Sequence, residues 1–280
     1  MTQWSTVDAV VVGGVHLGYR EAGDPGGHPA VLVHGTGSSS GTWDRFAARL
    51  AAAGHRVVAV DLRGHATSAR TGDYALGAIR DDLLGVMAAL GLRDALVVGH
   101  SVGGYAALAA AVRRPYRISR LVLEDLAAPP RRRTPVTSGA HRLLTGVAAL
   151  AARRDRPLGA MASIFAQLAR PDPQWWARLG QVRQPALVLS GGPASCIPPR
   201  RLAEVAAAMP DARLATIPVG HRIHSLAPDA FHAEVSAFLA AADAADADTA
   251  EAAGTAADAA GTATDAAGTA DAGGRLAIGP

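Results

Sequence analysis

A serine flanked by glycines carries the strongest chemical signal in the sequence. Residues 99–103 read Gly-His-Ser-Val-Gly, between a predicted strand over 95–99 and a predicted helix over 102–113. A sharp strand-to-helix turn brings two backbones together, so it needs glycine two residues either side of the serine, whose hydroxyl it exposes. A plain Gly-rich loop is the alternative, but this placement makes Ser101 the expected nucleophile.

Two backbone amides are expected to stabilise the oxyanion that forms when a serine attacks a carbonyl. The amide of Val102 lies at the start of a predicted helix, next to the nucleophile. Residues 34–38, His-Gly-Thr-Gly-Ser, follow a predicted strand and can offer the amide of Thr36 without side-chain obstruction. His34 is expected to be a structural, hydrogen-bonding residue.

A histidine is needed because serine is a poor nucleophile until an imidazole takes its proton. Of the ten histidines, His221 alone lies on a late strand-end loop and follows the nucleophile in chain order. His224 is the competitor, which we interpret as local support because it lies closer to the final predicted helix. Three further side chains are expected to contact substrate: His100, Trp175 and Trp176.

Short apolar strands alternate with helical patterns along most of the chain. After a hairpin over 8–21, strands are expected at 30–34, 56–61, 95–99, 121–125, 186–190 and 212–218. Helices are expected at 43–52, 74–90, 102–113, 199–209 and 227–240. This alternation predicts an α/β fold with a mainly parallel sheet covered by helices on both faces.

Two segments depart from this alternation. Residues 129–184 predict two or three helices, which we interpret as a lid inserted into a core of residues 1–128 and 185–240, because ligands bind beyond the carboxyl ends of parallel strands. The alternative is a helical crossover packed at the side of the core. Residues 241–280 are rich in Ala, Asp, Thr and Gly without bulky apolar side chains, and we expect them to be disordered.

These elements, in this order, resemble the α/β-hydrolase superfamily over roughly residues 8–240. Residues 61–65, Asp-Leu-Arg-Gly-His, followed by Ser68, resemble that family's D-x-R-G-H-G-x-S stretch, with Ala66 in place of the second glycine. The Gly-His pair at 220–221 fits as well. The resemblance implies an eight-stranded sheet, a serine–acid–histidine triad, and no metal or organic cofactor.

The acid of that triad is absent from its usual place. The resemblance puts it in the loop 191–198, where Ala194 stands at the expected aspartate. An earlier strand ends in Glu124 and Asp125, and some relatives, including haloalkane dehalogenases, place their acid after that strand. Because adjacent strand residues point to opposite faces, only one of the two carboxylates can reach His221.

We favour Asp125 because it lies nearer the open end of the strand, and we keep Glu124 as the alternative acid. If both carboxylates were structural, a Ser–His dyad would remain. Loss of the oriented aspartate lowers turnover in a serine protease by about 10⁴, so we expect an acid.

The constellation predicts a serine hydrolase of the carboxylesterase class. Its substrate is expected to be a small ester-like molecule: a carboxylic ester, a thioester or a lactone. One alternative is a pathway-specific C–C hydrolase or lactone-forming enzyme on the same triad. Another is a ligand-binding homologue without catalysis, supported only by the missing carboxylate at Ala194.

Composition narrows the partners. All 27 basic residues are Arg, which excludes a lysine nucleophile and is typical of a GC-rich bacterial genome. The net charge of +3 divides into −6 on residues 241–280, with seven acidic residues and one Arg, and +9 on the remainder. The Arg residues are scattered, so nucleic-acid binding is not expected. With one cysteine, no signal-like leader and no long apolar stretch, we expect a cytoplasmic protein without a membrane partner. No oligomeric state is predicted.

Overall fold

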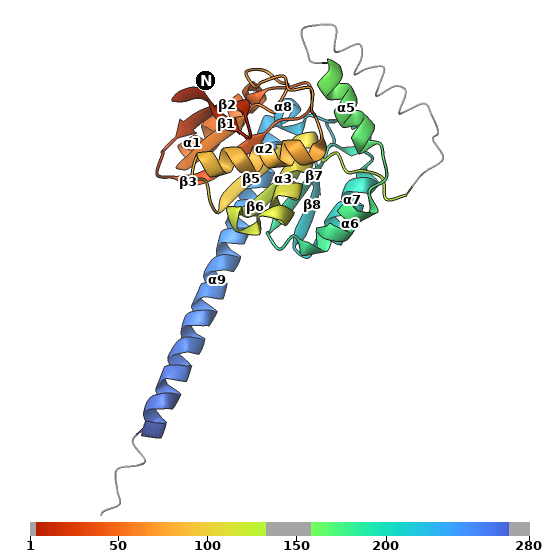
Figure 1. The fold of residues 1–280 in the computed structure, drawn as a ribbon. Coiled ribbons are helices and arrows are strands. Elements are labelled where there is room, and N and C mark those ends of the chain that lie inside the picture. The colour runs from red at the N-terminus through yellow and green to blue at the C-terminus, as the bar shows by residue number, and fades with distance from the viewer. Residues whose placement is uncertain (1–3, 133–157, 269–280) are drawn as a thin grey trace, which may run out of the picture. The chain divides into compact units, whose positions relative to one another are not determined.

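The computed structural model describes residues 4–132 and 158–268. An eight-stranded sheet forms its centre, in the order β1-β2-β4-β3-β5-β6-β7-β8 (Figure 1). β2 pairs antiparallel with β1 and β4, and all other neighbours pair parallel. The predicted α/β class and the eight-stranded, mainly parallel sheet are therefore confirmed.

The strands span Thr6–Val12 (β1), Val15–Gly23 (β2), His28–Val33 (β3), His55–Val60 (β4), Ala95–His100 (β5), Ile118–Glu124 (β6), Ala186–Ser190 (β7) and Ala212–Thr216 (β8). The helices are Asp44–Ala52 (α1), Leu76–Ala89 (α2), Val102–Arg113 (α3), Leu158–Leu168 (α5), Pro173–Arg178 (α6), Pro199–Ala208 (α7), Ile223–Leu226 (α8) and Pro228–Gly268 (α9). Most lie within a few residues of the ranges that the hydrophobic pattern predicts.

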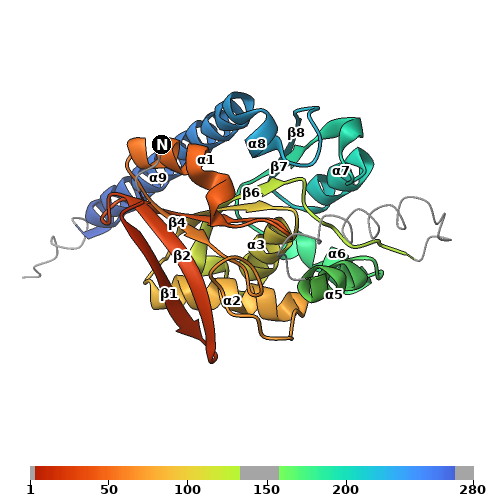
Figure 2. The ribbon, with the colours of Figure 1, turned by 90° about the horizontal axis from the view of Figure 1, so that it is seen from above.

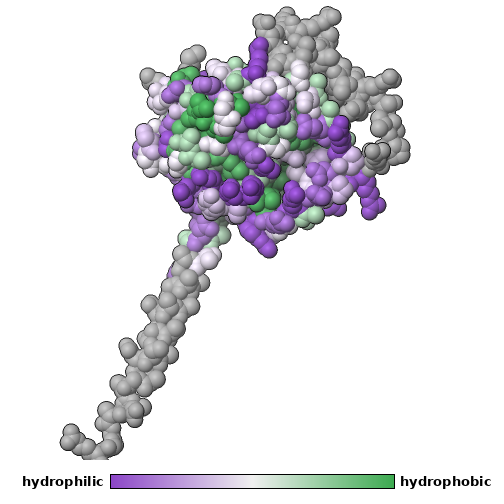
Figure 3. Space-filling model, in the orientation of Figure 1, coloured by the Kyte–Doolittle hydropathy of each residue, from purple (hydrophilic) through white to green (hydrophobic). Residues whose placement is uncertain are grey.

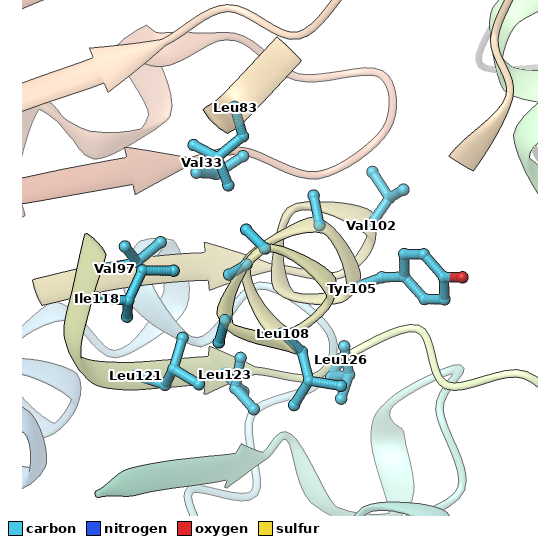
Figure 4. Close-up of a cluster of buried hydrophobic side chains, with 14 of the residues drawn as sticks. Val33, Leu83, Val97, Val102, Tyr105, Leu108, Ile118, Leu121, Leu123 and Leu126 are labelled. Atoms are coloured by element: carbon cyan, nitrogen blue, oxygen red, sulfur yellow. The ribbon is translucent and has the colours of Figure 1, made fainter. Parts of the chain in front are cut away.

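The central strands are buried because helices cover both faces of the sheet. All six residues of β5 are buried, as expected for an apolar parallel strand. α1 and α8 lie on one face, and α2 and α3 lie on the other (Figure 2). Figure 4 shows side chains of α3, β5 and β6 gathered in one buried cluster, which fixes the helix that begins after Ser101.

The register brings the carboxyl ends of three strands to one edge. Val33 of β3 pairs with Gly99 of β5, and His100 of β5 pairs with Glu124 of β6. The loops that follow these strands therefore start side by side. This edge is where ligands bind in parallel sheets of this kind.

The predicted lid is described only in part, because residues 133–157 lie outside the described residues. The remainder includes α5 and α6. Gln167 of α5 attaches to the start of α2: its Oε1 accepts the Leu76 N–H at 3.0 Å, and its Nε2 donates to Tyr74 O at 3.0 Å. The division into core and lid stays a prediction.

Residues 241–268 are helical, whereas the sequence predicted disorder. The chain divides into two compact units, Met1–Val235 and Ser236–Pro280, and α9 runs from the first into the second. Alanine has the highest intrinsic helix propensity and is the most common residue of this segment. This propensity favours a helix even though the segment has no bulky apolar side chains. The prediction of disorder also covered residues 269–280, which lie outside the described residues.

The surface of the unit that carries the sheet is mixed in character. Hydrophilic and hydrophobic residues are interspersed on the face shown in Figure 3. Within residues 4–132 and 158–268, none of the helices combines the length and the apolar composition that crossing a membrane requires.

Candidate active site

Ser101 lies on a strained turn between β5 and α3. Its backbone has φ 54° and ψ −115°, a region that residues other than glycine rarely adopt. A Cβ on Gly99 would lie 2.5 Å from a backbone carbon of Gly103, and a Cβ on Gly103 would lie 2.3 Å from Val33 O. Both glycines of the motif are therefore required by close backbone approach, as predicted.

The Gly-rich loop after β3 packs directly against this turn. A Cβ on Gly35 would lie 2.6 Å from His100 Nδ1 and 3.1 Å from Ser101 Cβ. The loop carrying Thr36 and the helix start carrying Val102 thus lie beside the same serine. The role of these two amides as oxyanion donors stays a prediction.

A buried imidazole holds one end of this loop. His34 Nε2 accepts the Leu62 N–H at 3.0 Å, and its Nδ1 lies 2.7 Å from Gly35 O. Burial lowers the pKa of His34 to about 3, so the ring is neutral, with Nδ1 as the donor. The structural role expected for His34 agrees with these contacts.

Residues 61–68, the stretch that resembles D-x-R-G-H-G-x-S, form hydrogen bonds to the same loop. His65 Nε2 accepts the Gly37 N–H at 3.0 Å, and burial lowers the pKa of His65. Asp61 Oδ1 accepts the Ser40 N–H at 2.6 Å. Ala66 has φ 40°, which explains why glycine is usual at its position.

His221 lies in the loop between β8 and α8 and is paired with Asp125. Its Nδ1 lies 2.7 Å from Asp125 Oδ2; the aspartate side chain is fully buried, whereas the imidazole is 29% exposed. Burial alone would lower the pKa of His221. The hydrogen bond to Asp125 and the nearby Cys196 outweigh burial and raise that pKa to about 10. Asp125 therefore holds Nδ1 of the imidazole, and the ring also interacts with the Cys196 side chain.

The structure brings Ser101 and His221 to the same edge without a hydrogen bond between their side chains among the described residues. In enzymes without substrate such catalytic hydrogen bonds are often long, and they shorten when substrate binds.

The loop after β7 holds the carboxylate of Asp125. Gly191 N–H donates to Asp125 Oδ1 at 2.9 Å, and the Ser195 hydroxyl donates to Asp125 Oδ2. This is the loop in which Ala194 replaces the expected acid. The loop therefore donates hydrogen bonds to Asp125, which follows the neighbouring strand β6.

Glu124 points away from His221 and pairs with His224. The His224 ring Nδ1 lies 2.6 Å from Glu124 Oε2, and its backbone N–H donates to Glu124 Oε1 at 2.9 Å. The other ring nitrogen, Nε2, lies 2.7 Å from Thr42 Oγ1, and the ring packs on Trp43 with centroids 4.2 Å apart. The pair is almost completely buried, at 0% and 1% side-chain exposure.

His100, expected to contact substrate, is 4% exposed, and its ring contacts the loop that carries His221. Its Nε2 lies 2.8 Å from His221 O, and burial lowers the pKa of His100 to about 3, so this nitrogen donates as part of a neutral ring. Its contact with substrate stays a prediction.

The two tryptophans expected to contact substrate face different surroundings. Trp175 stacks on Tyr105, with centroids 5.9 Å apart, and lines a groove of about 310 Å³ between α2, α3 and α6. None of Ser101, His221 and Asp125 lines that groove. Trp176 donates from Nε1 to Pro129 O at 2.9 Å. A role for either indole in substrate binding stays a prediction.

Sequence reasoning missed the donors to Asp125, because Gly191 and Ser195 lie 66 and 70 residues from it. A hydroxyl beside Ala194, in the loop where the resemblance places an acid, was the signal available. Among the described residues, no cluster of three or more His, Cys, Asp or Glu side chains could hold a metal ion.

Comparison with known proteins agrees with the fold. A family model described as alpha/beta hydrolase fold matches residues 29–156. The sn-1-specific diacylglycerol lipase ABHD11 of Mus musculus is 28% identical over 258 residues, covering 75% of this chain and 80% of that protein. A 2-hydroxymuconate semialdehyde hydrolase of Pseudomonas putida is 35% identical over 117 residues, 41% of each chain. The crystal structure of the enol-lactonase from Burkholderia xenovorans LB400 superposes with a TM-score of 0.69 and 26% identity, covering 83% of this chain and 99% of that one.

Fold and site together define a protein of the α/β-hydrolase class, with a serine on the strand-to-helix turn. The chain has the α/β-hydrolase fold, a family model of that description matches its residues 29–156, and the relatives named above support a hydrolase.

Proposed function

We propose that the protein is a serine hydrolase that cleaves a carboxylic ester, thioester or lactone through an acyl-enzyme on Ser101. The observation that carries this proposal is the 2.7 Å contact between Asp125 Oδ2 and His221 Nδ1, at the edge where Ser101 is held in a strained turn. The acid that is missing at Ala194 is thereby replaced from the neighbouring strand.

In the first half of the reaction His221 Nε2 takes the proton of Ser101 as its Oγ attacks the substrate carbonyl. The negative oxygen of the tetrahedral intermediate accepts hydrogen bonds from the amides of Thr36 and Val102. The intermediate collapses, the C–O or C–S bond breaks, and His221 returns the proton to the leaving alcohol or thiol.

In the second half water attacks the acyl-enzyme. His221 takes a proton from the water, and Ser101 Oγ leaves with that proton to restore the free enzyme. Asp125 holds the imidazole in one tautomer and stabilises the positive charge that it carries in both halves.

The activities named for the relatives support this class of chemistry. One is a lipase and another an enol-lactonase, and both names describe cleavage of a carboxylic ester bond. The C–C hydrolase alternative draws support from the semialdehyde hydrolase, over a shorter alignment.

Hydrolysis of p-nitrophenyl acetate and butyrate by wild type, Ser101→Ala and Asp125→Asn tests the proposal. We expect turnover by wild type, loss in Ser101→Ala, and a fall of about 10⁴ in kcat for Asp125→Asn. Poor turnover of both esters with rapid fluorophosphonate labelling of wild type would favour the C–C hydrolase. Turnover that survives Ser101→Ala contradicts the proposal.

A further inference from the structure

The carboxylate of Asp125 is held by more than His221. Its Oδ1 accepts the Gly191 N–H at 2.9 Å, and its Oδ2 accepts hydrogen bonds from both the Ser195 hydroxyl and the His221 ring. The side chain is completely buried. Asp125 also has φ 44°, so its backbone is strained where its side chain is most strongly held.

The Ser195 hydroxyl is oriented rather than free to rotate. Its Oγ accepts the Ile197 N–H at 3.0 Å, which occupies a lone pair and directs the hydroxyl proton toward Asp125 Oδ2. Ser195 has φ −78° and ψ 151°, an unstrained extended conformation. The side chain is therefore in place before any substrate arrives.

We propose that Ser195 is a positioning residue, which acts on catalysis through Asp125 and makes the acid at the end of β6 serve in place of the one absent at Ala194. This inference rests on the proposed function. The Gly191 amide holds Oδ1 of the Asp125 carboxylate, and the Ser195 hydroxyl holds Oδ2. Together they fix the plane of the carboxylate so that Oδ2 faces His221. Without Ser195 the carboxylate can rotate about the Gly191 contact, and the imidazole loses its fixed orientation.

The test compares Ser195→Ala, Ser195→Thr and Ser190→Ala in p-nitrophenyl butyrate hydrolysis. Ser190 is the matched control, because its hydroxyl lies near the same loop and accepts the Gly192 N–H at 3.2 Å without contacting Asp125. We expect kcat of Ser195→Ala to fall about 10- to 100-fold, the effect of losing one hydrogen bond to a charged group. KM should change little, and Ser195→Thr should retain most of kcat.

A double-mutant cycle separates positioning from general loop stability. If Ser195 acts through Asp125, then Ser195→Ala in an Asp125→Asn background should lower kcat no further. A full additional fall in that background would overturn the inference, as would wild-type kcat in Ser195→Ala or an equal fall in Ser190→Ala.

Fluorophosphonate labelling distinguishes failure of this inference from failure of the proposed function. Labelling of Ser101 should slow in Ser195→Ala by the same factor as kcat. If wild type reacts at Ser101 and Ser195→Ala reacts equally fast, only the role of Ser195 is wrong. If wild type does not react at Ser101, the proposed function is wrong and this inference is overturned with it.

Discussion

Glu124 and Asp125 are adjacent in the chain, yet their carboxylates bind two different histidines. Asp125 faces His221 at 2.7 Å, and Glu124 faces His224 at 2.6 Å. Glu124 is the last residue of β6, and Asp125 follows it in a turn with φ 44°. The two side chains therefore diverge, and each of the two histidines, three residues apart, meets one acid. Asp125 lies beside the exposed site, whereas Glu124 belongs to the interior.

Glu124→Gln should lower stability more than catalysis. Hydrogen bonds to a buried charged group contribute about 1.5–3 kcal/mol each, and the Glu124 carboxylate accepts the His224 backbone N–H and contacts the His224 ring. We expect urea unfolding at pH 7 to show a loss of about 3 kcal/mol, while kcat per folded molecule stays within a few-fold of wild type.

The matched control is Asp229→Asn, which breaks the exposed ion pair of Asp229 with Arg49. Exposed pairs contribute little, so this variant should unfold like wild type. A Glu124→Gln protein as stable as wild type but with kcat reduced by orders of magnitude would mean that Glu124, and not Asp125, is the acid.

Activity should rise with pH through the neutral range. His221 must be neutral to accept the Ser101 proton, and its pKa is raised to about 10, so the fraction of enzyme with a free base increases as pH rises toward that value. We expect log(kcat/KM) for p-nitrophenyl butyrate, corrected for spontaneous hydrolysis, to increase above pH 6.5. Asp125→Asn should move the inflection to lower pH. A wild-type profile that stays flat well below pH 6.5 would show that His221 is not the base.

Gly103→Ala should distort the turn on which Ser101 lies. Its Cβ would lie 2.3 Å from Val33 O, a backbone atom that cannot move aside without shifting β3. Overpacking of this kind costs about 1–3 kcal/mol or more, and turnover should fall with it. Gly180→Ala is the control, since a Cβ there meets nothing within 4 Å. Equal thermal midpoints and rates for the two variants would contradict the role given to Gly103.

Stability should fall as pH drops below about 6.5. Burial lowers the pKa of His100 to about 3, whereas the unfolded chain binds a proton at this histidine near pH 6.5. Between these values the unfolded state holds more protons, so unfolding becomes easier by about 1.4 kcal/mol per pH unit for one such histidine. His100→Gln should reduce the slope of unfolding free energy against pH between 4 and 6. The exposed His16→Gln should leave it unchanged, and the same slope in both variants would contradict this account.

Much of the fold was readable from local pattern. Strands and helices were predictable because a buried parallel strand such as β5 is a short apolar run, and glycines around Ser101 report backbone approach directly. The histidine-to-acid pairing required strand alternation as well as the motif. That reasoning led to Asp125 and Glu124 as the two possible acids.

Other contacts had no local signal. Ser195 and Asp125 meet only because β6 and β7 are neighbours in the sheet, and nothing in the loop sequence specifies which carboxylate its hydroxyl binds. The contact between the His100 ring and His221 O joins residues 121 positions apart and likewise had no local signal. The helix over 241–268 was missed because apolar content was weighed and alanine's propensity was not.

The most direct test of the central claim is the mass of the protein after reaction with a fluorophosphonate, followed by peptide mapping of the adduct. We predict one adduct per chain on Ser101, no adduct in Ser101→Ala, and slower labelling in Asp125→Asn. An adduct on another residue, or labelling that is undiminished in Ser101→Ala, would contradict Ser101 as the nucleophile.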